Sequence, residues 1–278
     1  MFRARQTRAR HPLPLSLFVM RRVRVCSTRI FYLDGVRGGA PLVKGCRRMT
    51  ELEERWRRVV DGVAEAARAA GRPADAVRLV AVSKFHPAGA VAELAGLGQR
   101  DFGENYVQEA RAKQEALADL PLRWHAIGPV QTNKAKDVAG RFALIHTVDS
   151  ERLAEALARR LEPGIEQEVL IQVNIGYEPQ KAGVEPGGLA ALMERLLTAP
   201  RLRVRGLMCL PPRCGEGEEA RPYFARLREL RDEAERRFGV DLPHLSMGMS
   251  GDYRQAVAEG ATLVRVGTDI FGPRPLRP

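Results

Sequence analysis

Long apolar runs are missing from this 278-residue sequence. It contains no stretch of about 18 uninterrupted apolar residues, the length needed to cross a membrane as a helix. With 45% hydrophobic and 28% charged residues, it also lacks the low hydrophobicity that disordered chains combine with high charge. We therefore expect no transmembrane helix and a globular protein with one large core or two small ones.

Cysteine is scarce, with only Cys26, Cys46, Cys209 and Cys214 in the chain. These residues form no CxxC pair, and no histidine follows closely enough to complete a zinc-binding cluster. The pattern argues against a structural metal site. It favours a reducing compartment, so we expect the protein to be cytoplasmic.

Acidic residues are almost absent from residues 1–48, which hold eleven Arg and Lys44 against a single acid, Asp34. The other 230 residues carry 33 basic and 33 acidic groups, so the net charge of +11 belongs entirely to the first segment. A neutral body gives no reason to expect nucleic acid or a membrane surface as a partner.

Three interpretations of the basic segment stay open: a start codon assigned too early or a dispensable tail, a targeting sequence, or a functional arm. The first is favoured because Met49 directly precedes a capping box formed by Thr50 and Glu53. An amphipathic helical pattern follows and ends before Gly71 and Pro73, with one apolar face made of Leu52, Trp56, Val59, Val60, Val63 and Ala67. We expect residues 1–48 to be a disordered extension and residues 49–278 to form the folded domain.

Short apolar runs alternate with helical patterns from Leu79 onward. The runs predict strands over 79–83, 100–103, 124–128, 144–148, 169–175, 204–210, 244–248 and 263–267. The segments between them predict helices over 88–97, 105–117, 131–140, 151–161, 187–198, 219–238 and 252–259. This alternation is typical of a parallel sheet, and eight such units indicate a single closed (β/α)8 barrel. No GxGxxG follows the first strand, which weakens a dinucleotide-binding interpretation.

Lys84 is the first candidate functional residue, because barrel enzymes place their chemistry where strands end. The chain uses 39 Arg but only 6 Lys. Arginine cannot form an imine, whereas a partly desolvated lysine can. Lys84 directly follows the apolar run Leu79–Ser83, so we expect it to point into the barrel mouth. An ordinary loop lysine is the alternative.

Two segments rich in small residues, Ser246–Gly251 and Val266–Thr268, follow the last two predicted strands. Barrels commonly bind phosphate at this place, and Ser250 could lie at a helix N-terminus. Tight turns are the alternative reading. Arg265, inside the last strand, either faces the mouth or forms a salt bridge on the outer face. A lysine, a phosphate site and an arginine together suggest pyridoxal 5'-phosphate (PLP), although a Schiff-base aldolase acting on a phosphosugar would use the first two as well.

From Met49 to Arg274 the sequence resembles the YggS/PROSC family of pyridoxal phosphate homeostasis proteins. The resemblance rests on Leu79–Lys84, Phe102–Glu109, Trp124–Lys134, His146–Asp149, Ile171–Asn174, Lys181–Gly183, Arg205–Met208, Leu245–Ser250 and Val264–Thr268. It does not extend to residues 1–48. It implies a barrel like the N-terminal domain of alanine racemase, with PLP held as an aldimine on Lys84.

The same resemblance implies the other contacts of the cofactor. Ser250, Gly267 and Thr268 would hold the phosphate, with backbone help around Met249. Arg265 would face the pyridine nitrogen. Asn105 would lie near the ring and Ser246 near the phosphate.

Other polar residues carry weaker expectations. His125 is read as a satisfied core histidine rather than a base. Lys134, Lys136 and Lys181 are read as solvated surface lysines, with a role at the pocket rim as the alternative. Tyr106 and Tyr253 are expected to begin helices at the mouth, where they could flank a ring or simply pack.

We therefore predict a monomeric cytoplasmic protein that buffers or delivers PLP, with apo-enzymes as recipients and no catalysis of its own. A one-domain amino-acid racemase is the first alternative, and a Schiff-base aldolase is the second. Arg265 would disfavour a protonated ring nitrogen, which weakens catalysis. The second-domain tyrosine that serves alanine racemase as a base is not expected before Pro278. The sequence names neither the recipients nor the route of PLP release.

Overall fold

The computed structural model describes residues 49–212 and 217–273. The chain divides into two units, Met1–Arg47 and Arg48–Pro278, and all the described residues belong to the second. The expectation of disorder in residues 1–48 lies outside the described residues, as do Cys26, Cys46 and Cys214.

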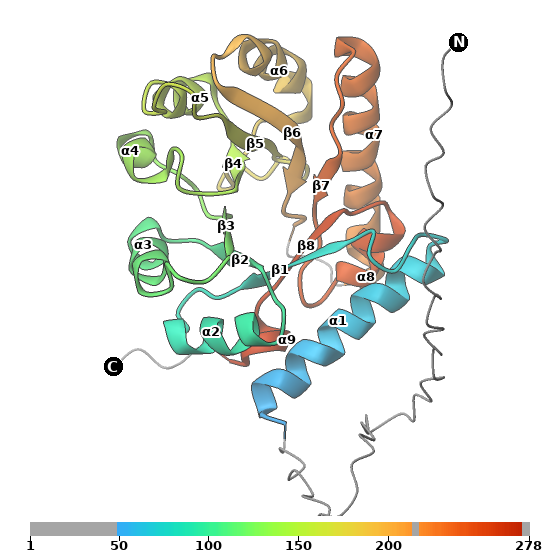
Figure 1. Cartoon of the computed structure of the whole chain (residues 1–278). Helices are drawn as coiled ribbons and strands as arrows, with labels where there is room; N and C mark the ends of the chain where they lie inside the picture. The colour runs from blue at the N-terminus through green and yellow to red at the C-terminus, as the bar shows by residue number, and fades with distance from the viewer. Residues whose placement is uncertain (1–48, 213–216, 274–278) are drawn as a thin grey trace, which may run out of the picture. The chain divides into compact units, whose positions relative to one another are not determined.

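Eight parallel strands close into a barrel in the order in which they follow each other along the chain. Figure 1 shows them at the centre of this unit, with helices around them. They are β1 (Arg78–Val82), β2 (Asp101–Glu104), β3 (Arg123–Ala126), β4 (Leu144–Val148), β5 (Gln167–Val173), β6 (Leu202–Cys209), β7 (His244–Ser246) and β8 (Leu263–Val266). β1 pairs with β8 in parallel, which closes the barrel. The predicted (β/α)8 barrel is thus confirmed.

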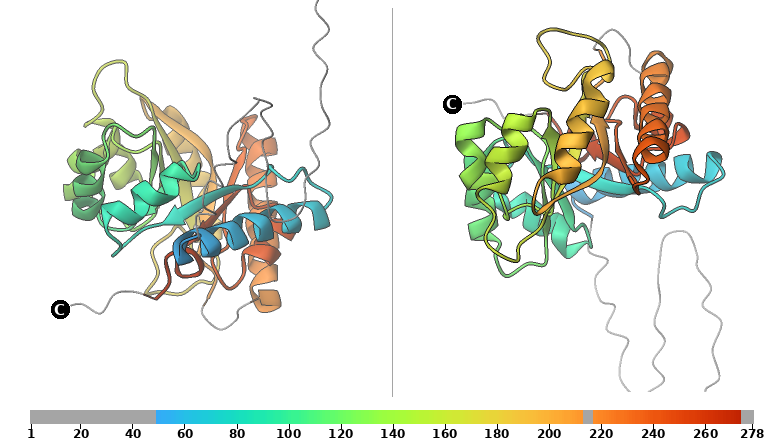
Figure 2. Two further views of the ribbon diagram at one scale, coloured as in Figure 1. Left: turned by 60° about the horizontal axis from the view of Figure 1, so that its bottom comes forward. Right: turned by 90° about the horizontal axis from the view of Figure 1, so that it is seen from above.

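Helices surround the strands, as the two further views in Figure 2 show. They are α1 (Glu51–Ala69), α2 (Ala88–Gly96), α3 (Val107–Ala116), α4 (Ala135–Val138), α5 (Glu151–Ala158), α6 (Leu189–Thr198), α7 (Arg221–Phe238), α8 (Tyr253–Ala258) and α9 (Thr268–Phe271). The predicted helix over 131–140 is a 3-10 turn, Thr132–Lys134, followed by the short α4. The one-turn α9 was not predicted, because four residues are too few to show a helical period.

Helix α1 begins where the capping box predicts. The Thr50 side chain accepts a hydrogen bond from the backbone N–H of Glu53 at 3.1 Å, which satisfies a donor that the first helical turn leaves unpaired. Val59, Val63 and Ala67 are buried on the inner face. The helix packs against α8 and α9, the helices that follow β7 and β8.

Two apolar clusters hold the barrel. The larger lies between strands and helices. The smaller consists of Val80, Leu144, Leu170, Met208 and Leu263. Along the strands these residues alternate with members of the larger cluster, and neighbouring strand residues point to opposite faces, so the smaller cluster fills the barrel interior.

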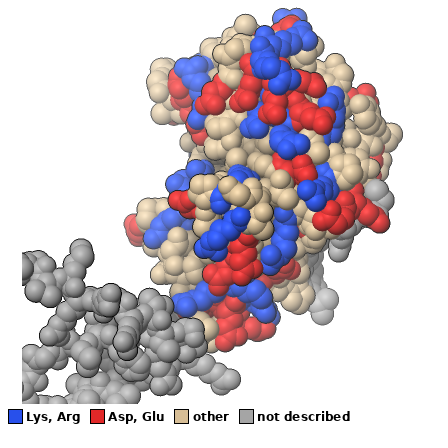
Figure 3. Space-filling model, turned by 90° about the vertical axis from the view of Figure 1, so that its right-hand side faces the viewer, with Lys and Arg blue, Asp and Glu red and all other residues tan. Residues whose placement is uncertain are grey.

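The surface of the described unit mixes both signs of charge. Figure 3 shows Lys and Arg interleaved with Asp and Glu over one face, in keeping with the neutral sequence beyond residue 48. Within residues 49–212 and 217–273, none of the helices has the length and apolar character to span a membrane. No cluster of His, Cys, Asp and Glu in these ranges is arranged to hold a metal ion.

Candidate functional site

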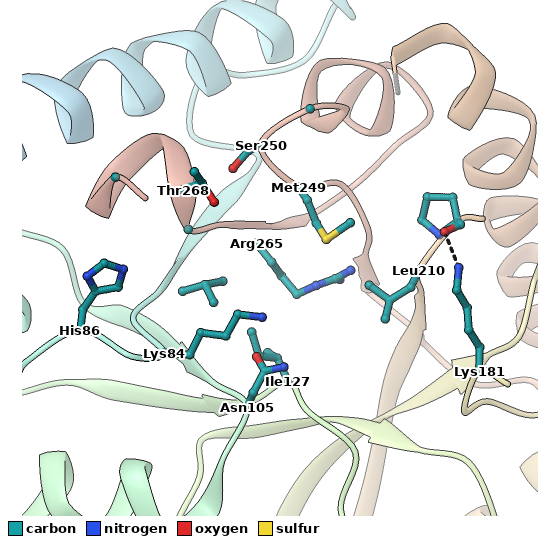
Figure 4. A pocket seen from close by; sticks show the side chains of 15 residues that line it. Lys84, His86, Asn105, Ile127, Lys181, Leu210, Met249, Ser250, Arg265 and Thr268 are labelled. Carbon is teal, nitrogen blue, oxygen red and sulfur yellow. Dashed lines mark hydrogen bonds between the residues drawn. The ribbon is translucent and has the colours of Figure 1, made fainter. Parts of the chain in front are cut away.

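A pocket of about 480 Å³ opens at the carboxyl ends of the strands. Its walls come from the carboxyl ends of seven of the eight strands and the segments that follow them, with β4 the exception (Figure 4). The lining residues are Val82, Lys84, His86, Asn105, Ile127, Lys181, Leu210, Pro211, Met249, Ser250, Gly251, Arg265, Gly267, Thr268 and Gly272. This volume suits a small-molecule ligand.

Lys84 extends into this pocket toward the space between Asn105 and Arg265 (Figure 4). The chain turns sharply after it, because Phe85 adopts a positive φ of 68°. This conformation is uncommon for a residue with a side chain. The backbone N–H of Phe85 donates to Glu109 Oε1 at 2.5 Å, which holds the turn against α3. The expectation that Lys84 points into the mouth agrees with the structure.

Two turns form the opposite wall, and each has a glycine where the backbone packs closely on its neighbours. Gly248 has φ of 92°, and a Cβ there would lie 2.6 Å from Cβ of Ala256. A Cβ on Gly267 would lie 3.2 Å from the carbonyl oxygen of Val82. Glycine therefore lets both turns approach their neighbours closely. Ser250 and Thr268 extend from these turns on the same side of the pocket (Figure 4).

Asp252 organises the first of these turns. Its Oδ1 accepts a hydrogen bond from the backbone N–H of Met249 at 2.6 Å. The backbone around Met249 was expected to help bind the phosphate, but the N–H of Met249 already donates to this carboxylate. Helix α8 begins at Tyr253 with Asp252 at its N-cap position, so Ser250 lies in the turn that precedes the helix rather than at its N-terminus.

Arg265 faces the barrel interior and lines the pocket with only 4% of its surface exposed. Its Nη1 donates to Ser246 Oγ at 2.5 Å, and its Nη2 donates to the carbonyl oxygen of Cys209 at 2.9 Å. Burial lowers the pKa of this guanidinium from its usual value. Burial also raises the pKa of the Cys209 thiol to about 12, so this cysteine is an inert core residue.

Asn105 contributes an acceptor to the pocket wall. Its Oδ1 is buried and, within the described part of the chain, has no hydrogen-bond partner. A buried polar atom without a partner is costly, and a ligand in the pocket can supply the missing bond. The pocket thus offers an amine, a fixed guanidinium, an open amide oxygen and two hydroxyl groups.

Seven of the eight predicted site residues line the pocket: Lys84, Asn105, Met249, Ser250, Arg265, Gly267 and Thr268. Ser246 differs from them. It is fully buried, and its Oγ bonds Arg265 and His146. The expectation that Ser246 lies near a phosphate disagrees with this position, because β7 points its side chain into the barrel behind Arg265.

His125 is a core histidine, as predicted, with both ring nitrogens hydrogen-bonded. Lys181 lines the pocket, donates to the Pro211 carbonyl at 2.8 Å and pairs with Glu178.

Lys134 and Lys136 belong to the segment after β3 and are not among the lining residues. Tyr106 precedes α3 and packs on Phe85, while Tyr253 is buried beside α1. Neither tyrosine lines the pocket.

Sequence reasoning missed His86 and Asp252. His86 lines the pocket and stacks on Phe271, with ring centroids 4.9 Å apart. Burial, then the charge of Lys113, lowers the pKa of its ring. No spacing pattern marks this histidine. Asp252 carried a usable signal, because an aspartate three residues after the start of a turn commonly binds a backbone N–H there.

Comparison with known proteins places this architecture in a family. The model of the alanine racemase N-terminal domain matches residues 60–275. The pyridoxal phosphate homeostasis protein of Aquifex aeolicus is 47% identical over 222 residues, which cover 80% of this chain and 97% of that protein.

Solved structures agree with this placement. The structure of PipY from Synechococcus elongatus with PLP bound has a TM-score of 0.68 and 43% identity, and the match covers 76% of this chain and all of that one. Alanine racemase from Corynebacterium glutamicum shares the fold, with a TM-score of 0.57, 20% identity and coverage of 78% and 62% of the two chains.

The fold and the site thus define a barrel of the alanine racemase N-terminal class. The chain is also 46–47% identical to relatives that the match covers almost completely, to 97% of their length. The chain belongs to the family of pyridoxal phosphate homeostasis proteins.

Proposed function

We propose that this protein binds PLP in the barrel-mouth pocket and buffers or delivers it in the cytoplasm. The observation that carries the proposal is the convergence of Lys84, Arg265 and the Ser250–Thr268 wall on one cavity. Relatives named for PLP homeostasis and the PLP-bound structure of PipY support it. Residues 49–278 would carry this function as one domain.

Each side chain has a role that fits the cofactor. Lys84 would hold the aldehyde of the cofactor, because a lysine can form an imine and an arginine cannot. Ser250 and Thr268 would donate hydroxyl hydrogens to the phosphate, beside the backbone of Gly267. Arg265 would donate to the ring nitrogen, and Asn105, which lines the same pocket, would contact the ring. Bound PLP supplies an electron-withdrawing ring that stabilises negative charge on a carbon attached to it.

The site favours a carrier over a racemase. Arg265 only donates hydrogen bonds, so it disfavours a protonated ring nitrogen and weakens electron withdrawal. Racemases tolerate an arginine at this point, so the comparison depends on the groups that could move protons. Racemisation also needs an acid or base on each side of the substrate carbon. Lys84 can serve one side. Tyr106 and Tyr253, the two tyrosines expected near the mouth, both lie outside the pocket lining. His86 does line the pocket, but its ring is stacked on Phe271.

Transfer of cofactor tests the proposal. We expect PLP-loaded protein to restore activity to a PLP-dependent apo-enzyme, and we expect alanine and serine not to racemise faster than with free PLP. Lys84→Ala protein treated with PLP and desalted is the control and should restore far less activity. Turnover of alanine that disappears in the Lys84→Ala variant would instead establish a racemase. A purified protein that takes up no PLP would leave the phosphosugar aldolase as the remaining candidate.

A further inference from the structure

Five buried side chains form an unbroken chain of hydrogen bonds through the barrel interior. Arg265 Nη1 lies 2.5 Å from Ser246 Oγ, which lies 2.8 Å from His146 Nδ1. His146 Nε2 lies 3.0 Å from His125 Nδ1, and His125 Nε2 lies 2.9 Å from Asp101 Oδ1. The chain crosses from β8 to β2 by way of β7, β4 and β3. It joins the pocket to the amino-terminal end of the strands, since Asp101 begins β2.

The two ends determine which way every hydrogen points. Arg265 can only donate and an ionised Asp101 can only accept. Ser246 therefore accepts from Arg265 and gives its own hydrogen to His146 Nδ1. His146 must then carry its proton on Nε2, which it donates to His125 Nδ1. His125 in turn carries its proton on Nε2 and donates it to Asp101.

We propose that Asp101, His125, His146 and Ser246 form a one-directional relay that positions the Arg265 guanidinium in the pocket from the far end of the barrel. All four are positioning residues, since of the five linked side chains only Arg265 lines the pocket. The contribution of the relay to PLP recognition rests on the proposed function. The direction of its hydrogen bonds does not.

Charged neighbours support the ionised state of Asp101. Burial by itself would raise the pKa of this carboxyl, but hydrogen bonds from His125 and Arg123 outweigh burial and hold the pKa below its usual value. Arg123 donates from Nε at 2.9 Å and from Nη2 at 2.6 Å, and Arg78 lies 4.0 Å away. The acceptor end of the relay is therefore a stable anion.

The reversed arrangement is less favourable. In that arrangement His125 would donate from Nε2 to Asp101 and also from Nδ1 to His146 Nε2, so its ring would be doubly protonated. His146 would then carry its proton on Nδ1 and donate it to Ser246. The Ser246 oxygen would then accept from both neighbours, and its own hydrogen would have no acceptor in the relay. It would also add a second cation near Arg265. Burial first, then the nearby charges of His125, Arg265 and His244, keeps the pKa of His146 well below its usual value.

The direction of the relay has a consequence for Arg265. A hydroxyl that donates to one neighbour becomes a better acceptor for the next, so the chain strengthens the Ser246–Arg265 bond. The bond to the Cys209 carbonyl fixes the second Nη atom. With both terminal nitrogens held, the donors of Arg265 that remain keep one orientation toward a ligand. This would let the pocket recognise a ring nitrogen rather than any flat ring.

Nitrogen NMR of the histidines tests the direction without cofactor. The sequence has five histidines, so long-range proton–nitrogen correlations of labelled protein can resolve His125 and His146. We expect both rings to be neutral with the proton on Nε2 at pH 7, and His146→Phe and His125→Phe spectra assign the signals. A proton on Nδ1 of either ring, or a charged imidazolium, would overturn the relay.

Ligand discrimination tests the positioning. The probe is the affinity ratio of PLP to its 1-deaza analogue, in which carbon replaces the ring nitrogen. We expect the wild type to prefer PLP, and we expect Ser246→Ala and His146→Phe to lose most of a roughly tenfold preference. Ser246→Thr, which keeps the hydroxyl, should retain it. His244→Phe, a histidine on β7 outside the relay, should retain it as well.

The outcomes separate the two proposals. Melting curves identify any variant that does not fold, and Ser246→Ala, which removes a single oxygen atom, is expected to fold. If the wild type binds no PLP, the proposed function fails, while the NMR experiment still decides the relay. If the wild type prefers PLP and both relay variants keep that preference unchanged, the positioning role is overturned.

Discussion

Lys113 and Glu104 form an ion pair inside the protein, with Nζ and Oε1 2.7 Å apart and side-chain exposures of 6% and 0%. The same ammonium group donates to Glu109 Oε1 at 2.7 Å and to the Ser83 carbonyl at 2.6 Å. Ser83 and Glu104 directly precede Lys84 and Asn105 in the chain. The pair thus ties the ends of β1 and β2, which present two pocket side chains, to helix α3.

Removing one member of this pair should be costly. Lys113→Met leaves a buried carboxylate without its cation, and we expect a loss of about 3–5 kcal/mol in the free energy of unfolding. Urea titration at pH 7 measures the loss. Adding Glu104→Gln to this variant removes the unpaired charge and should restore part of the stability. A Lys113→Met protein as stable as the wild type would contradict the assigned role of the pair.

Reduction by borohydride should locate the cofactor. Protein loaded with PLP is expected to be yellow, and reduction should leave the cofactor covalently attached to Lys84, because this amine extends into the pocket. Peptide mapping by mass spectrometry reads the position, with Lys84→Ala as the control. A label found mainly on Lys134, Lys136 or Lys181 would refute the assignment.

The two hydroxyl groups of the pocket wall should matter only for a phosphorylated ligand. Ser250→Ala and Thr268→Ala each remove one hydrogen bond to a charged group, worth about 1.5–3 kcal/mol. We expect the affinity for PLP to fall about tenfold or more in each variant. The affinity for pyridoxal, which has no phosphate, should change little. Equal losses for both ligands would argue against a phosphate site at this wall.

His244 should make the protein less stable in acid. Burial, then the charges of Arg78 and Arg205, lowers the pKa of its ring from 6.5 to about 4. Between these values the unfolded chain binds a proton that the folded protein does not, so the free energy of unfolding falls as the pH drops from 6.5 toward 4. Urea midpoints at pH 7 and pH 4.5 should differ less for His244→Gln than for the wild type. An identical difference in both proteins would exclude His244 as a source of the acid sensitivity.

A chain that begins at Met49 should fold and bind PLP as the full chain does. The reason is local: Thr50 caps α1, whose first residue is Glu51. Thermal melting and a PLP titration of the two proteins provide the comparison, and Thr50→Ala in the shorter chain should lower its stability by about 1 kcal/mol. An insoluble or PLP-free shorter chain would show that residues 1–48 belong to the functional unit.

Much of the architecture could be read from local sequence. Strand Leu144–Val148 was predicted with its observed bounds, and the start of α1 followed from its capping box, because both signals involve residues within a few positions of one another. Two shorter elements differ from their predicted bounds. The strand predicted over 244–248 is His244–Ser246, and the helix predicted over 131–140 is reduced to Ala135–Val138 after a 3-10 turn. The ends of short elements are the part of a sequence-based prediction that is least determined locally.

By itself, the sequence determined the order of eight strand–helix units and hence which residues follow each strand. That was enough to predict that Lys84, Ser250 and Thr268 would meet at one mouth, because parallel strands end at the same edge. The place of Asn105 in the site was predicted from the family resemblance. Tertiary structure alone decided that Ser246 lies behind Arg265 and that His125, His146 and Asp101 continue its hydrogen bonds. Hydrogen-bonded partners in this relay are 19 to 100 residues apart in the sequence, so no local pattern marks them as partners. Such partners are set by the register and closure of the barrel, which fix the interior side chains that face one another.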